Sequence, residues 1–472
     1  MRSAPAIHVA IVLALSTALC PAAARAQTPD AQRRLEREIF EELIEVNTSD
    51  SARGTPRLAA AIAQRLRAAG FPDADITVTG FDPTLQNVVV RYRGRSGGKK
   101  PILLMAHLDV VDARREDWSF DPYTFLERDG YYYGRGTSDN KAGAAILIAS
   151  FIRLRAEGFV PDRDLIMVLT ADEETTGDSI RWLVEQRRAL VDADYAINTD
   201  AGEGALRDGE PQTFSVQASE KMYLTYELTV RNKGGHSSLP VPDNAITRLS
   251  RGLVRIADHE FPVRLNEVSR AYFEATAPAE APDVAAAMRA LLRNGDAAAA
   301  RRLTAASPYY NAVMRTTCVA TRLFAGHADN ALPQLATATV NCRLLPDESP
   351  DSVRATLVLV AADSAIEVRE AAPPVPSPAS PLRADVLDPI RRLAESMWPG
   401  VRIVPNMSTG ATDGLYVRNA GIPVYGASAI FEDIGDVRAH GRDERVGVKS
   451  FHDASSFWYQ MLKAITGGDR AT

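Results

Sequence analysis

The side chains best suited to chemistry in this chain follow three short apolar segments, 101–106, 165–170 and 195–199. The first is followed by His107 and Asp109, the second by Asp172, Glu173 and Glu174, and the third by Asp200. Binding sites in open α/β sheets form beyond the carboxyl ends of the strands. We therefore expect these acidic and histidine side chains to meet in one cleft.

Several carboxylates can be brought together out of water only if a strong positive charge compensates them. Divalent metal ions supply that charge, and a donor set of His, Asp and Glu without Cys suits Zn²⁺, with Co²⁺ or Mn²⁺ as substitutes. A fourth segment, 134–139, contains Gly134 and Gly136, which allow a tight turn that directs Asp139 into the same cleft. Taken alone, each of these motifs has a simpler explanation. His107 could be a core histidine, 172–174 and 134–139 could be turns, and Asp200 could cap a helix. Their joint occurrence favours a metal site.

The elements that must position these groups alternate between strand and helix. Helices are expected at 31–46, 57–69, 141–157 and 179–190, and strands at 87–92, 101–107, 164–170 and 194–199. This alternation predicts an α/β fold with a largely parallel, buried sheet. After the Pro-rich stretch 373–381, a helix (383–397), two strands (401–404 and 423–427) and a final helix (450–466) return to the same character.

The middle of the chain has a different pattern. Strands at 222–231, 316–324, 335–345 and 365–370 and helices at 243–258 and 350–362 predict a small ferredoxin-like α+β layer. An Ala-rich helical stretch at about 265–306 is expected to belong to the same layer. We predict a catalytic domain in two segments, 27–219 and 373–472, interrupted by a lid or dimerisation domain at 220–372.

Composition limits the class of protein. The chain has 472 residues, too many for one hydrophobic core, and 46% hydrophobic with 24% charged residues is ordinary for a globular protein. The formal charge is −6 without a block of like charges, which argues against a nucleic-acid partner. No H-E-x-x-H motif occurs, so a thermolysin-like protease is not expected.

The amino terminus resembles a secretory signal peptide over residues 1–26. Arg2 precedes an apolar run at 9–19, and Ala24-Arg25-Ala26 is a small-x-small cleavage site. The run is too short to span a bilayer, so we expect a periplasmic or secreted protein without a stable membrane anchor. An oxidising compartment permits a bridge between Cys318 and Cys342, which lie on two strands that could pair, but two separate buried thiols fit the sequence equally well.

Taken together, the motifs resemble the co-catalytic dizinc amidohydrolase and peptidase family. That family includes aminoacylases, bacterial glutamate carboxypeptidase, yeast carboxypeptidase S, cytosolic dipeptidases, acetylornithine deacetylase and succinyl-diaminopimelate desuccinylase. The matching segments run in the family's order over nearly all of the chain after residue 26. They are His107-Leu-Asp109, Gly134-Arg-Gly136-Thr-Ser-Asp139-Asn-Lys141, Asp172-Glu173-Glu174, Asn198-Thr-Asp200, Gly234-Gly-His236 and His440-Gly-Arg-Asp-Glu444.

The resemblance implies two zinc ions bridged by Asp139. His107 and Asp200 would complete the ligands of one ion, and Glu174 and His440 those of the other. Glu173 would be the general base, and Asp109 would orient His107.

The resemblance also assigns roles outside the metal centre. His236 would help to hold the reacting carbonyl oxygen, Asn330 and Arg343 would contact the substrate, and Gly410 would lie in a loop close to it. An Arg suits a carboxylate because its guanidinium binds both oxygens, although a surface cation on a strand is the alternative for Arg343. Many relatives form homodimers through the lid domain, and in some the counterpart of His236 acts across the dimer.

The expected function is therefore an exported dizinc metallohydrolase that cleaves peptide or amide bonds with a metal-bridging hydroxide. Export favours an exopeptidase, either a carboxypeptidase or a dipeptidase. An aminoacylase-like N-acyl amino acid amidohydrolase is the alternative. A non-catalytic metal-binding or ligand-binding protein is a third hypothesis, which the pair Glu173 and Glu174 disfavours.

Overall fold

A computed structural model describes residues 28–95 and 98–467. The expected signal peptide lies outside these residues. Within them, no helix is both long and apolar enough to cross a membrane.

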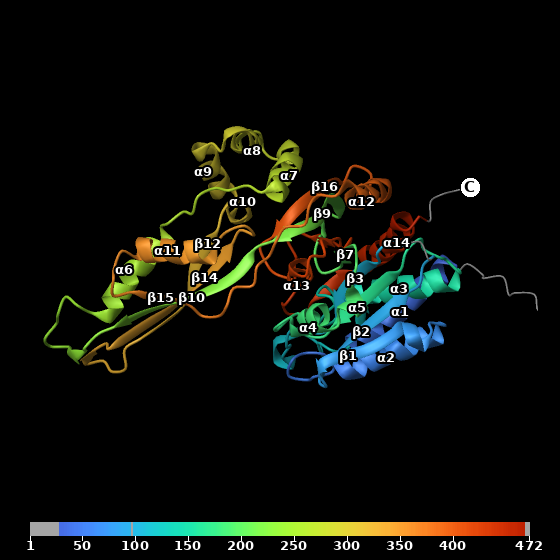
Figure 1. Ribbon diagram of the computed structural model, residues 1–472, viewed down its shortest axis with the longest axis horizontal. Coiled ribbons are helices and arrows are strands. Elements are labelled where there is room, and N and C mark those ends of the chain that lie inside the picture. The colour runs from blue at the N-terminus through green and yellow to red at the C-terminus, as the bar shows by residue number, and fades with distance from the viewer. Residues whose placement is uncertain (1–27, 96–97, 468–472) are drawn as a thin grey trace, which may run out of the picture.

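The larger part of the molecule is built on a ten-stranded sheet in the order β1-β2-β6-β3-β7-β17-β9-β8-β18, with β16 beside β9 (Figure 1). The pairs β6–β3, β3–β7 and β7–β17 are parallel, and antiparallel strands flank them, which confirms the expected α/β class. The bounds are β1 Ile76–Asp82, β2 Leu85–Tyr92, β3 Ile102–His107, β6 Leu165–Thr170, β7 Tyr195–Asn198, β8 Gly204–Arg207, β9 Glu210–Glu220, β16 Arg402–Ser408, β17 Val424–Gly426 and β18 Phe431–Asp433.

Helices cover both faces of this sheet. On β3, Leu104 packs into one hydrophobic cluster, whereas Leu103 and Met105 pack into another, because successive side chains point to opposite faces. One face carries α1 Pro29–Ile44, α2 Thr55–Ala68, α3 Lys141–Ala156, α12 Ala384–Met397 and α14 Val448–Ile465. The other carries α4 Asp178–Gln186, α5 Arg188–Val191 and α13 Gly414–Asn419. The strands are therefore buried on both sides, as their continuous apolar sequences predict.

The segment between β9 and α12 contains a separate four-stranded antiparallel sheet in the order β12-β14-β10-β15, at the left of Figure 1. Its elements are β10 Met222–Arg231, α6 Ala245–Ala257, β12 Thr317–Ala325, β14 Leu335–Leu344, α11 Pro350–Ala361 and β15 Glu367–Glu370. This βαββαβ order agrees with the ferredoxin-like layer expected from the sequence. Leu224 and Tyr226 alternate with Tyr223 along β10, so one face packs under the helices and the other faces away from them.

Two small antiparallel sheets complete the structure. The first pairs β11 Gly235–His236 with β13 Ala331–Leu332, and the second contains β4 Leu126–Arg128, β5 Tyr131–Tyr133 and β19 Arg445–Gly447.

The Ala-rich stretch does not pack where the sequence analysis placed it. It forms α7 Glu267–Thr276, α8 Pro282–Asn294, α9 Ala297–Ala306 and α10 Pro308–Met314. Val268, Phe273 and Met288 join the hydrophobic cluster of the large sheet, and Tyr309 donates a hydrogen bond to the Met407 carbonyl of β16, at 3.1 Å. The expectation that this stretch belongs to the four-stranded layer is wrong, because α7 packs against β16 of the large sheet and α8, α9 and α10 pack on one another beyond it.

Cys318 and Cys342 lie directly opposite each other on β12 and β14 and form a disulfide. Of the two alternatives left open by the sequence, the structure contains the bridge. The antiparallel register decides this, because it brings the two Cα atoms to 4.0 Å.

Candidate metal centre and active site

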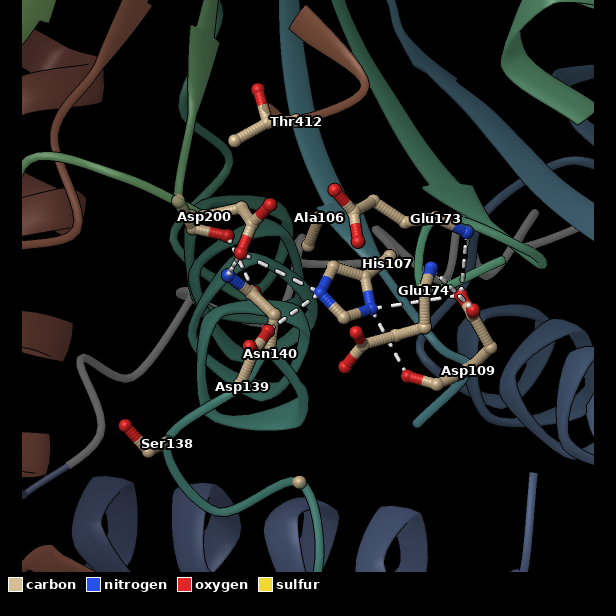
Figure 2. A network of polar contacts seen from close by, with 12 residues as sticks. Ala106, His107, Asp109, Ser138, Asp139, Asn140, Glu173, Glu174, Asp200 and Thr412 are labelled. Carbon is tan, nitrogen blue, oxygen red and sulfur yellow. Dashed lines mark hydrogen bonds and ion pairs between the residues drawn. The ribbon is translucent and has the colours of Figure 1, made fainter. Parts of the chain in front are cut away.

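The three predicted strands place their carboxyl ends side by side. β3 lies between β6 and β7, and His107 at the end of β3 pairs with Thr170 at the end of β6. Glu173 and Glu174 follow β6, and Asp200 follows β7, so their side chains gather around His107 (Figure 2). Ligating atoms of His107, Glu173 and Asp200 lie within 4.8 Å of one another, as do those of His107, Asp139 and Glu174.

Asp139 lies between two halves of this cluster. Its Oδ1 is 2.9 Å from Nε2 of His107, which is also 3.5 Å from Oδ1 of Asp200. Its Oδ2 is 3.0 Å from Nε2 of His440, which is 2.9 Å from Oε2 of Glu174. The two oxygens of one carboxylate thus face two separate His–carboxylate pairs, an arrangement that suits a bridging ligand.

The pKa values show how strongly these groups depend on positive charge. Burial raises the pKa of Asp200 to about 7, and burial with the charge of Asp200 raises the pKa of Glu173 well above its ordinary value. Hydrogen bonds to Asp139 and Glu174 raise the pKa of His440 to about 10. Burial lowers the pKa of His107, but the nearby carboxylates outweigh it, so that His107 also binds its proton tightly.

The donor set fits two divalent cations. Imidazole and carboxylate ligands at about 2.0–2.2 Å from a tetrahedral Zn²⁺ are separated by about 3.3 Å, close to the distances around Asp139. The carboxylates favour the protonated forms of both histidines, and a metal ion would take the place of those protons because only neutral imidazole is a ligand. The candidate metal site is therefore His107, Asp139, Glu174, Asp200 and His440.

Asp109 supports this cluster in two ways. Its Oδ1 and Oδ2 accept hydrogen bonds from the backbone N–H groups of Glu173 (3.1 Å) and Glu174 (2.9 Å), which fixes the turn after β6. Nδ1 of His107 lies 3.0 Å from the Asp109 carbonyl oxygen and 3.6 Å from its Oδ1, so the same residue orients the imidazole. The assigned role is compatible with this geometry, and the turn contact extends it.

Glu444 is a supporting residue that the sequence analysis quoted in a motif but did not assign. It is fully buried and ion-paired with Arg135, and it accepts hydrogen bonds from the N–H groups of Gly136, Ser138 and Asp139 at 2.7–3.1 Å. These bonds hold the 134–139 turn and with it the bridging carboxylate. The sequence feature that could have indicated this role is the position of Glu444 four residues after His440, within a segment that resembles the family.

Asn140 is a second residue without an assigned role. Its Nδ2 donates to Oδ1 of Asp200 at 3.1 Å, and its Oδ1 accepts from the Thr199 hydroxyl at 2.9 Å. Gly143 permits this approach, because a Cβ there would lie 2.2 Å from both Asn140 Oδ1 and Thr199 Oγ1.

A cavity of about 760 Å³ opens beside the cluster and extends to the four-stranded sheet. Its lining includes Asp139, Glu173 and His440 from the large part of the molecule, and Tyr223 and Arg343 from β10 and β14. Tyr223 and Arg343 are cross-strand neighbours, and the guanidinium carbon lies 4.6 Å from the ring centroid. Among the described residues, Arg343 forms no ion pair, and burial lowers its pKa.

The remaining substrate-contact candidates lie elsewhere in this single chain. His236 is exposed on β11, and the N–H of the adjacent Ser237 donates to the Asn330 carbonyl at 3.0 Å, so His236 and Asn330 are close to each other but do not line the cavity. Gly410 is not a lining residue either, although Ala411 next to it and Ser408 two residues before it are. The structure thus gathers the five candidate metal ligands, Glu173, Asp109 and Arg343, and leaves out His236, Asn330 and Gly410.

We expect Glu444→Gln to weaken binding of divalent metal by about 10- to 100-fold, because the substitution removes the charge that holds the turn carrying Asp139. Titration calorimetry with Zn²⁺ measures the effect. Glu395→Gln, on the exposed face of α12, is the matched control. Unchanged metal affinity in folded Glu444→Gln protein would contradict the positioning role.

A sequence model described as peptidase family M20/M25/M40 matches residues 103–464. The human protein named N-fatty-acyl-amino acid synthase/hydrolase PM20D1 is 29% identical over 400 residues, which cover 82% of this chain and 76% of that protein. A carboxypeptidase S-like protein of Dictyostelium discoideum is 25% identical over 396 residues, covering 80% of this chain and 74% of its own.

Solved structures share the fold. An M20 family metallo-carboxypeptidase from Sulfolobus solfataricus superimposes with a TM-score of 0.67 at 20% identity, covering 91% of this chain and 98% of that one. A dinuclear metal-binding peptidase of the M20 family from Bacillus subtilis gives 0.58 at 12% identity, covering 93% and 99%. The family model spans about three quarters of the sequence and includes every residue of the candidate metal site, and the chain therefore belongs to peptidase family M20/M25/M40.

Proposed function

We propose that this protein is an exopeptidase of the carboxypeptidase or dipeptidase type, which releases a carboxyl-terminal amino acid by hydrolysing its amide bond. Membership of the family makes the protein a hydrolase, and its relatives include a carboxypeptidase S-like protein and an N-fatty-acyl-amino acid hydrolase. One observation carries the proposal. A single cavity contains both the metal-site cluster with Glu173 and the guanidinium of Arg343, which has no carboxylate partner among the described residues.

N-acyl amino acids are the second candidate substrate class. Hydrolysis of a peptide and of an N-acyl amino acid breaks the same kind of bond and leaves the same free carboxylate on the released amino acid. The presence of Arg343 in the cavity favours both, because its planar guanidinium can bind two carboxylate oxygens.

The proposed cofactors are two Zn²⁺ ions, with Co²⁺ or Mn²⁺ as substitutes. His107 and Asp200 would hold one ion, Glu174 and His440 the other, and Asp139 would bridge them, in keeping with the direction of its two oxygens. When bound, such ions lower the pKa of water and polarise the substrate carbonyl.

Glu173 is the proposed general base and acid. Its carboxylate takes a proton from the attacking water and then delivers it to the nitrogen of the leaving amino acid as the C–N bond breaks. Burial keeps its pKa raised, which suits a group that must both accept and donate a proton. Arg343 holds the carboxylate of the leaving amino acid and so fixes the scissile carbonyl near Glu173.

A homodimer through the four-stranded sheet would bring His236 into the reaction. β12 is an edge strand, and Val319, Leu323 and Phe324 on it are 54–63% exposed. Exposed apolar edge strands are sites for pairing with another chain. A second copy seated there could supply His236 to the cavity, where it would stabilise negative charge on the carbonyl oxygen.

Export to the periplasm or the medium is proposed from the amino-terminal sequence. The disulfide between Cys318 and Cys342 supports it, because such bridges persist in oxidising compartments.

We expect Glu173→Gln to retain the metal content of the native protein and to lose about 10²–10⁴-fold in kcat, because the amide cannot accept the proton. Steady-state kinetics with a dipeptide, together with elemental analysis of the same sample, measures both effects. Turnover close to that of the native protein would show that Glu173 is not the base.

Arg343→Ala should raise KM for substrates with a free carboxyl terminus by about 10- to 100-fold, because a charge-assisted pair contributes about 1.5–3 kcal/mol. Substrates with an amidated terminus should be affected far less. Arg369→Ala, an exposed arginine on β15 of the same sheet, is the matched control. Equal KM changes for free and amidated substrates would remove the proposed role.

The dimer proposal is tested with two inactive variants, His236→Ala and Glu173→Gln. A heterodimer of the two, purified through different tags, contains one cavity with both native residues and should recover about half of the native activity per dimer. Each variant alone should stay inactive. A mixed preparation without activity, or a monomer in sedimentation, would contradict the proposal.

A further inference from the structure

A second cavity, of about 610 Å³, adjoins the one that holds the candidate metal site. The two cavities have five lining residues in common, Glu173, Thr175, Tyr223, Ala411 and Thr412. The volume lies within the range of roughly 300–1,000 Å³ that is usual for ligand pockets. A substrate whose scissile bond lies at Glu173 therefore has access to both spaces.

Three segments that are far apart in the sequence form the walls. One wall is β10 together with chain 371–375, and the Ala371 N–H donates to the Thr225 carbonyl at 2.8 Å. The second is the start of α13, with Leu415 and Tyr416. The third is the turn 175–177 directly after Glu173 and Glu174.

Tyr416 is fitted closely against that turn. A Cβ at Gly177 would lie 2.4 Å from the Tyr416 ring, and the Tyr416 hydroxyl donates to the Thr176 carbonyl at 2.8 Å. Gly177 also has a positive φ of 62°. These contacts hold the aromatic wall in place beside the turn that carries the candidate base.

The two linings differ in chemistry. The first cavity contains Arg343, His440 and several carboxylates. Apart from Glu173, the only ionisable acid lining the second is Asp413, which is buried and accepts a hydrogen bond from the Thr170 hydroxyl at 2.5 Å. Its other walls combine the apolar residues Ala371, Ala372, Pro373, Val375 and Leu415 with two tyrosines and four threonines.

We propose that the second cavity binds an apolar acyl group of the substrate, on the opposite side of the scissile bond from the carboxylate held by Arg343. The acyl group is either the hydrocarbon chain of an N-acyl amino acid or the apolar side chain of the residue that precedes the released amino acid. The inference rests on the proposed function, since it takes Arg343 as the carboxylate site and Glu173 as the position of the bond. Burial of apolar surface in this cavity would then make the enzyme prefer substrates with larger apolar acyl groups. Each buried methylene can raise kcat/KM by up to about fourfold.

The experiment uses metal-loaded protein and two substrate series. The first is N-acetyl-, N-butanoyl-, N-octanoyl- and N-decanoyl-leucine, all below their micelle concentrations, and the second is Gly-Leu, Leu-Leu and Phe-Leu. Val375 lines the second cavity and not the first, so Val375→Trp is chosen to fill the second cavity, and Val358→Trp, on the exposed face of α11, is the matched control. A third series, N-acetyl-Gly, N-acetyl-Leu and N-acetyl-Phe, varies only the released amino acid.

In the native protein, kcat/KM should rise with acyl length or with the size of the first residue. Val375→Trp should lower kcat/KM by about tenfold or more for decanoyl-leucine or Phe-Leu and by less than about twofold for acetyl-leucine or Gly-Leu. Comparison of the N-acyl-leucine series with the dipeptide series shows whether the cavity prefers a hydrocarbon chain or an amino acid side chain.

A flat profile in both series would overturn the inference, as would an equal loss for short and long acyl groups in Val375→Trp. A variant that alters only the third series would show that the cavity binds the side chain of the released amino acid, which also overturns it. Failure of the proposed function is distinguishable, because the native protein would then hydrolyse no member of any series.

Discussion

The need to compensate buried negative charge dominates this structure. Asp139, Glu173, Glu174 and Asp200 converge at the end of a buried sheet, where like charges repel strongly because little water screens them. Positive charge on His107 and His440, whose pKa values these carboxylates raise, would compensate part of that charge. Two divalent cations would compensate the negative charge more completely. The carboxylate of Asp139, with one oxygen facing each histidine, suits such a pair of ions.

These like-charged side chains stay close together only if the backbone turns that carry them are held in place. Asp109 fixes the turn of Glu173 and Glu174 through two backbone N–H groups, and buried Glu444 fixes the turn of Asp139 through three. Asn140 orients Asp200 from the start of α3. Four of the five candidate ligands, all except His440, are therefore positioned by a residue outside the ligand set, so substitutions at these supports should alter the site without removing a ligand.

The substrate side of the site depends on the junction between the two sheets. Only Lys221 separates β9 from β10, and its buried ammonium group donates to the Ala312 and Arg315 carbonyls at 2.8 Å. Glu220 beside it is ion-paired with Arg418 of α13. Since α7 packs on β16 and the end of α10 holds Lys221, this helical stretch helps to fix the strand that carries Tyr223, and through it the position of Arg343.

The sequence by itself determined the α/β class and most helices and strands, because apolar periodicity is a local property. It also placed candidate ligands after three of the strands, whereas Asp139 as a bridge and His440 were expected only from the family resemblance. It missed β9 and β1, whose mixed polar sequences lack a clear pattern. Only the tertiary structure decided that α7 packs on the large sheet with α8–α10 beyond it, that Glu444 holds the bridging turn, and that His236 and Asn330 lie outside the cavity of one chain. These facts depend on contacts between segments far apart in the sequence, and no local pattern encodes which buried surface an Ala-rich helix will cover or which backbone N–H groups a distant carboxylate will reach.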